Sequence, residues 1–182
     1  MKQFALTNRV PGDTVRVITT SRVSATKRIK EMVAAVALLT ERGVNVHLTI
    51  VGAPATTADE SYFRHLKSES GNTVSFTGAV LHEKLPELLA RAEVFLNLSA
   101  TESMDKAVLE ALATSMPVVT SNPAFREMLL PYGLFLEQLS PESVADTIAR
   151  ARATDISPLV IQVRLDHSLT GLVSKILGIL SI

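Results

Sequence analysis

Two short apolar runs, separated by a segment of helical composition, constrain the fold more than any other part of this chain. The runs are residues 94–98 and 117–120, and residues 106–113 between them favour a helix. The order strand, helix, strand predicts two parallel strands, because parallel neighbours need a crossover connection that is usually a helix. Ligands bind beyond the carboxyl ends of such strands. We therefore expect the loop 99–105 to lie at a ligand-binding edge.

The same pattern of apolar runs and helical segments continues along most of the chain. Residues 14–20, 44–51, 73–80 and 133–136 are predicted as further strands, with helical segments between them. Aromatic residues make up only 4% of the chain, so the core is expected to be aliphatic, as buried parallel strands require. The fold class is predicted to be α/β, a Rossmann-like open parallel sheet of about six strands with helices on both faces.

The length of the chain favours one domain. Its 182 residues can form one well-buried core but are too few for two ordinary ones. We expect residues 14–182 to form this domain, ending in an amphipathic helix over 167–182. Residues 1–13 are predicted to be a linker or an N-terminal extension.

Charge and cysteine content narrow the possible partners and the compartment. There are 18 basic and 18 acidic residues and no cysteine. A net charge of zero gives no reason to expect nucleic acid as a partner, and the lack of cysteine excludes disulfides and thiolate metal sites. The start of the chain has no apolar run of signal-peptide length, so we expect a cytoplasmic protein. Membrane association is expected to be peripheral at most, at the inner surface through the last helix.

Two carboxylates bracket the start of the helix at 106–113. Glu102 lies in the preceding loop and Glu110 lies on the helix. From Asp105 to Glu110 the helix axis rises by about 7 Å, which resembles the distance from a nucleotide's diphosphate to its ribose hydroxyls. The pattern is equally consistent with Glu102 interacting only with the helix dipole and Glu110 facing solvent.

The residues around these two acids resemble a known family signature. Glu102 is followed, after seven residues, by Glu110-Ala-Leu-Ala and then by Pro117-Val-Val. This order resembles the nucleotide-sugar-dependent retaining glycosyltransferases of family 4, also called group 1, which have the two-domain GT-B fold. The resemblance extends from about Val15 to the end of the chain. It implies that this chain is the C-terminal, donor-binding domain of such an enzyme.

The resemblance also implies roles for particular residues. Arg22 and Lys27, five residues apart after the first strand, would bind the donor diphosphate, and with Glu102 they are the catalytic candidates. Two fixed cations can neutralise a departing diphosphate without a metal ion. Glu110 would bind the ribose, and Glu102 would bind hydroxyls of the donor sugar. Backbone groups of two further residues would meet the base; these are Ala79 and Val80. No separate cofactor is implied, since the nucleoside-diphosphate sugar is the substrate.

The chain departs from the family pattern at the start of the predicted helix 106–113, the motif helix. The family commonly follows its first Glu with Gly-Phe-Gly, where this chain has Ser103, Met104 and Asp105. Lys106 stands where an apolar residue is usual. Either Asp105 caps the helix and Lys106 faces solvent, or Lys106 adds a third cation near the donor.

The predicted strands cover only the donor side of a GT-B enzyme. We expect the acceptor-binding half to be absent here or to be supplied by another chain, so that the isolated chain is inactive. The alternative function is a stand-alone or split nucleotide-binding module that requires such a partner. His82, Glu83 and Glu87 are predicted to face solvent, and the histidines lack metal-ligand spacing.

Overall fold

Five parallel strands form the centre of the computed structural model, which describes residues 4–7, 9 and 11–166. The strands are β1 (Val15–Thr20), β2 (Val46–Val51), β3 (Val74–Gly78), β4 (Val94–Asn97) and β5 (Val118–Thr120). Their order is β3-β2-β1-β4-β5, and every neighbouring pair is parallel. The direction of progression reverses between β1 and β4. Open α/β sheets bind ligands at this switch point, beyond the carboxyl ends of the strands.

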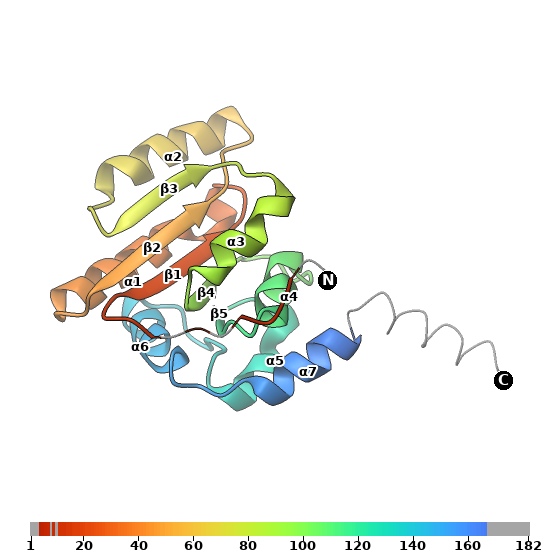
Figure 1. Cartoon of the computed structure of the whole chain (residues 1–182). Coiled ribbons are helices and arrows are strands. Elements are labelled where there is room, and N and C mark those ends of the chain that lie inside the picture. The colour runs from red at the N-terminus through yellow and green to blue at the C-terminus, as the bar shows by residue number, and fades with distance from the viewer. Residues whose placement is uncertain (1–3, 8, 10, 167–182) are drawn as a thin grey trace, which may run out of the picture.

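Helices cover both faces of the sheet, as predicted. They are α1 (Ile29–Glu41), α2 (Thr57–Glu69), α3 (Leu85–Ala90), α4 (Lys106–Ala113), α5 (Arg126–Leu129), α6 (Pro141–Ala151) and α7 (Ser157–Asp166). Parallel crossovers are right-handed, so the reversal of direction puts α1 and α2 on one face and α3 and α4 on the other (Figure 1). Helix α6 packs against α1, and α7 packs against α4.

The core is mainly aliphatic, and it includes the whole of the two strands that flank α4. All residues of β4 and β5 are buried, and Val94, Phe95 and Leu96 have no exposed surface. Strands covered on both faces consist of continuous apolar runs because neither side meets water. This burial fixes the loop between β4 and α4 at the edge of the sheet.

One predicted strand is not formed. Residues 133–136 make only an isolated bridge, in which Leu136 N donates to Thr120 O and Thr120 N donates to Leu134 O. The stretch lies between Gly133, at φ 66°, and a bend at 137–138, and β5 ends at Thr120. Too few residues remain extended for a ladder, so the sheet has five strands rather than about six.

The described residues before β1, which are 4–7, 9 and 11–14, pack onto the domain. Phe4 is buried at 2% exposure within the core. Arg9 donates from Nε to Ala92 O (2.8 Å) and from Nη2 to Leu89 O (3.3 Å) and Thr114 Oγ1 (2.8 Å). Burial lowers the pKa of Arg9 to about 10. The segment runs past the amino ends of β4 and β5 toward α4 (Figure 1).

The carboxyl-terminal part differs from expectation in one respect. Helix α7 was not predicted, although its buried residues Leu159, Val160 and Val163 pack it onto the domain. Its apolar residues lie on more than one face, so it lacks the amphipathic spacing by which helices are found. The predicted helix over 167–182 lies outside the described residues.

Candidate functional site

A cavity of about 300 Å³ lies at the carboxyl edge of the sheet. Four of the predicted site residues line it together, although they come from three separate stretches of the chain: Arg22, Ala79, Val80 and Glu110. The rest of the lining comes from the loops after β1 and β2 and from the starts of α3 and α4; it consists of Thr20, Ser21, Val51, Gly52, Ala53, Leu85 and Ala107. The cavity therefore lies at the predicted ligand-binding edge.

The loops around this cavity are held together by backbone contacts that continue the sheet. Ser21 N donates to Val51 O (3.0 Å), and Gly52 N donates to Gly78 O (2.9 Å). Gly52 has φ 145°, and a Cβ at this position would lie 1.8 Å from Ser21 O. Only glycine allows so close an approach of two backbones. These contacts fix the backbone of Arg22 next to the loop that carries Ala79 and Val80.

The side chain of Arg22 is held loosely. It is 53% exposed, and its Nε lies 3.8 Å from Asp59 Oδ2 at the start of α2. A half-exposed pair at this distance contributes little to stability. The guanidinium can therefore turn toward an anion in the cavity at little cost.

Lys27 lies in a short turn that displaces the start of α1. Residues Ala25–Lys27 form a 3-10 helix, and Arg28 has the left-handed φ of 52°. Because Arg28 has this left-handed backbone, α1 begins only at Ile29. Lys27 Nζ lies 3.1 Å from Asp105 Oδ2 and 3.3 Å from Ser99 Oγ. The turn thus brings Lys27 to the loop before the motif helix.

Asp105 connects this lysine to the sheet. Its Oδ1 accepts from Ala107 N (3.2 Å), so it caps α4, and its Oδ2 also accepts from Asn97 Nδ2 (3.1 Å). Asn97, at the end of β4, in turn accepts from Thr120 Oγ1 (3.1 Å). The carboxylate is 17% exposed and has Lys27 as its countercharge. A largely buried charge is tolerated when it is paired and hydrogen-bonded in this way.

Glu110 is the most deeply buried charged group of the cavity. Its side chain is 7% exposed, and its Oε1 lies 2.7 Å from His82 Nε2 and 3.3 Å from Lys106 Nζ. His82 is exposed, as predicted, but its imidazole also contacts this carboxylate. Lys106 is 77% exposed and pairs with Glu110 one helical turn away. The Lys106 side chain therefore extends along α4 toward Glu110.

The remaining candidates lie in the exposed loop between β4 and α4. Glu102, Ser103 and Met104 are all exposed. The backbone oxygen of Ser103 accepts from Asn122 Nδ2 (3.0 Å), and Asn122 also caps the turn that follows β5. Glu102 makes no hydrogen bond or ion pair with the part of the chain that the structure describes. The acid predicted to bind the sugar is therefore not fixed by the domain itself.

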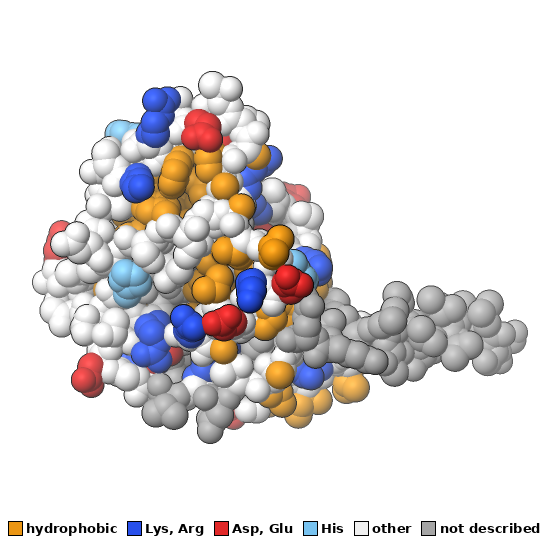
Figure 2. All heavy atoms as spheres, turned by 45° about the horizontal axis from the view of Figure 1, so that its top comes forward, with side chains coloured by type: hydrophobic (Ala, Val, Ile, Leu, Met, Phe, Trp, Pro, Cys, Tyr) orange, Lys and Arg blue, Asp and Glu red, His pale blue; other side chains and the backbone are white. Residues whose placement is uncertain are grey.

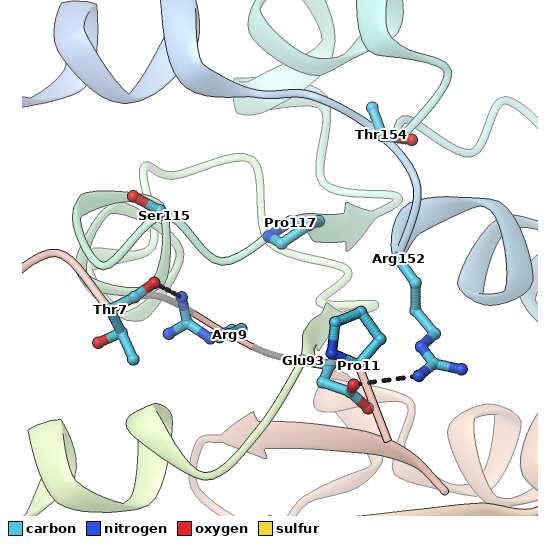
Figure 3. Close-up of a pocket in the computed structure, with 8 residues that line it drawn as sticks. All are labelled: Thr7, Arg9, Pro11, Glu93, Ser115, Pro117, Arg152 and Thr154. Atoms are coloured by element: carbon cyan, nitrogen blue, oxygen red, sulfur yellow. Dashed lines mark hydrogen bonds and ion pairs between the residues drawn. The ribbon is translucent and has the colours of Figure 1, made fainter. Parts of the chain in front are cut away.

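A second cavity, of about 170 Å³, lies at the amino edge of the sheet (Figure 3). Its central group is Glu93, 4% exposed, which accepts from Arg152 Nη2 (3.1 Å), Arg16 N (2.9 Å) and Gly12 N (3.2 Å). Local sequence patterns do not indicate this cluster, because its members are far apart in the chain. Its polar groups are used to join the N-terminal segment, β4 and the end of α6, which is a structural role.

Basic and acidic side chains are interspersed on the surface shown in Figure 2, next to exposed apolar side chains, rather than gathered in one basic patch. Within residues 4–7, 9 and 11–166, no group of three or more His, Cys, Asp or Glu side chains forms a possible metal site. None of the helices described is long and apolar enough to cross a membrane.

Solved structures share this fold. The C-terminal domain of the glycosyl transferase group 1 family protein LpcC from Francisella tularensis matches with a TM-score of 0.76 at 16% identity, over 92% of this chain and 97% of that one. Anabaena HepE in complex with UDP and glucose matches with a TM-score of 0.74 at 21% identity, over 92% of this chain and 48% of that one. Staphylococcus aureus TarM, in a complex that contains UDP, matches with a TM-score of 0.71 at 17% identity.

The chain spans 48% of the HepE chain and 37% of the TarM chain, but nearly all of the LpcC domain. No curated protein sequence matches it. The family model described as glycosyl transferases group 1 matches residues 14–153, which include both cations and both acids of the predicted site. The five-stranded sheet is thus one Rossmann-like half of a GT-B fold, and the chain belongs to the glycosyl transferases group 1 family.

Proposed function

We propose that this chain binds a nucleoside-diphosphate sugar and is the donor-binding half of a retaining glycosyltransferase. The main support is the cavity at the carboxyl edge of the sheet, where Arg22, Ala79, Val80 and Glu110 meet. A cation, a backbone segment and a carboxylate around one cavity match the three parts of a nucleotide: its diphosphate, base and ribose.

The cations have the chemistry that a diphosphate leaving group needs. Arg22 can form two parallel hydrogen bonds to phosphate oxygens, and Lys27 acts as a point charge. Negative charge on the diphosphate increases as the bond to the sugar breaks, so both cations stabilise the transition state more than the bound donor. This accounts for transfer without a metal ion. The exposed Glu102 would then contact sugar hydroxyls once the donor orders its loop.

The start of the motif helix supplies further polar groups. Helix α4 begins at Lys106 and is capped by Asp105, so its first amides lie beside Lys27. Ser103 and Met104 contribute backbone groups in the same loop. A helix N-terminus favours anions, and here the Asp105 carboxylate occupies it. A diphosphate would compete with that carboxylate for Lys27.

Transfer requires an acceptor-binding half, which we propose is supplied by another domain or another chain. Exposed apolar side chains next to the site, Leu81 (68% exposed) and Met104 (50%), are available for such a contact. The alternative is a stand-alone or split nucleotide-binding module that has no activity of its own and requires a separate acceptor-binding partner.

The test is direct binding of nucleoside diphosphates to this chain. UDP is the first probe, because the HepE and TarM structures contain it, and GDP and ADP follow. A ligand at 100 times its dissociation constant stabilises the fold by about 2.7 kcal/mol, which thermal unfolding detects. The proposal predicts stabilisation by at least one diphosphate, and much less by the matching nucleoside. No stabilisation by any of them at millimolar concentration would refute it.

A further inference from the structure

His82 makes a close contact that no recognised motif accounts for. Its Nε2 lies 2.7 Å from Glu110 Oε1. The histidine begins the 3-10 turn His82–Lys84, two residues after Val80 of the cavity. It therefore connects the loop proposed to meet the base with the helix that carries the proposed ribose ligand.

Glu110 depends mainly on this histidine for a fixed orientation. The carboxylate is 7% exposed, so an unpaired charge there would be costly. Its second partner, Lys106, is 77% exposed and 3.3 Å away, and such a pair is weakened by solvent. Both partners contact the same oxygen, Oε1. The second oxygen, Oε2, is therefore the one we expect to face a ligand.

The imidazole is itself held from a third direction. Its ring packs edge-on against Phe4, with the ring centroids 5.6 Å apart and an interplanar angle of 70°. Phe4 is 2% exposed and belongs to the segment before β1. Edge-to-face packing restricts the ring in addition to the area that it buries. His82 is thus an oriented side chain, although it is only about half buried.

We propose that His82 is a positioning residue that holds Glu110 for a ribose. Nε2–H donates to Oε1 and fixes the carboxylate, while Oε2 accepts hydrogen bonds from the ribose 2′ and 3′ hydroxyls. A hydrogen-bonded second partner commonly orients a ligand-binding group in this way, as it does at metal sites. This inference depends on the proposed function, because it requires a nucleotide in the cavity.

The test compares two ligands that differ only at the ribose. Binding of UDP and of 2′,3′-dideoxyuridine diphosphate is measured by calorimetry for the wild-type chain and for His82→Ala and His82→Gln. Losing an oriented hydrogen bond to a charged group costs about 10-fold or more in affinity, so His82→Ala should raise the dissociation constant for UDP by at least that factor. The affinity for the dideoxy ligand, which lacks both hydroxyls, should change by less than about twofold in this variant. The side-chain amide of His82→Gln can donate to Oε1 and should restore most of the UDP affinity. His65→Ala, at an exposed histidine of α2, is the matched control.

The outcomes separate the inference from the proposed function. If the wild-type chain binds no nucleoside diphosphate, the proposed function itself fails. If the wild-type chain binds UDP, two results would refute the positioning role. His82→Ala could leave the affinity for UDP unchanged, or it could lower the affinity for both ligands equally. Should His82→Ala not fold, NMR of the His82 imidazole nitrogens in the wild-type chain gives the same comparison. The Nε2 resonance should then shift with UDP and much less with the dideoxy ligand, and equal shifts would overturn the inference.

Discussion

Replacing Lys27 by alanine should weaken the binding of the UDP diphosphate, and the chain should still fold. The Lys27 side chain is 20% exposed, and its Nζ lies 3.1 Å from Asp105 Oδ2. A hydrogen bond to a charged group is worth about 1.5–3 kcal/mol, so the dissociation constant for UDP should rise about 10- to 150-fold. Asp105 keeps its hydrogen bonds from Asn97 and Ala107 in the variant. The free energy of unfolding should still fall by about 1.5–3 kcal/mol, because this carboxylate loses its charged partner.

Three comparisons identify the source of the loss. NMR titrations with UDP and with uridine separate phosphate binding from base and ribose binding, and only UDP affinity should fall. Lys30→Ala is the matched control, because Lys30 lies three residues further along and is 63% exposed. The double variant Lys27→Ala with Asp105→Asn removes the carboxylate that the single variant leaves without its lysine. It should recover part of the UDP affinity.

Two results would contradict a phosphate-binding role of Lys27. Equal losses for uridine and UDP would mean that Lys27 supports the fold of the loop rather than binding phosphate. An unchanged UDP affinity would mean that the lysine stays paired with Asp105 when the nucleotide is bound, and its catalytic assignment would be withdrawn.

Three further predictions concern the structure around the site. Glu93→Gln should destabilise the chain by about 2–4 kcal/mol in denaturant unfolding, since it leaves partly buried cations without their countercharge; a loss below about 0.5 kcal/mol would contradict this. Gly52→Ala should weaken UDP binding and lower stability, because its Cβ would lie 1.8 Å from Ser21 O, and unchanged binding and melting would show that the loops are not in contact. Hydrogen bonds from the start of α7 lower the pKa of Asp155 below 3.8, so its contribution to stability is present above that pH and is lost as pH falls through the lowered value. Asp155→Asn should therefore reduce the acid dependence of unfolding below pH 3.8, and identical acid profiles would contradict it.

Local patterns predicted most of the fold. The apolar runs identified all five strands, and the helical segments predicted between them correspond to α1, α2, α3 and α4. At the start of α6, Ser140 caps the helix and Pro141 takes its first position, which are both local preferences. These features depend on neighbouring residues, which is why the sequence carries them. The sixth strand predicted at residues 133–136 does not form, because β5 ends at Thr120 and only one bridge to these residues is made. That outcome depends on tertiary pairing rather than on neighbouring residues.

Contacts between distant residues were the part that local patterns could not supply. His82 and Glu110 are 28 residues apart, and nothing in the spacing of either indicates the other. Phe4, in the segment expected to be a linker or extension, is part of the core. The pairing of Lys27 with Asp105 depends on the 3-10 turn Ala25–Lys27 that precedes α1. In each case tertiary packing determines the partner.

The most direct measurement is a UDP titration of the isotope-labelled chain followed by NMR. The shifted backbone resonances should cluster at the carboxyl edge of the sheet, around Arg22, Ala79–Val80 and Glu110. Resonances around Glu93 and Arg152, at the amino edge, should stay in place. Shifts confined to the amino edge, or none at saturating UDP, GDP and ADP, would contradict the claim that this cavity holds a nucleotide.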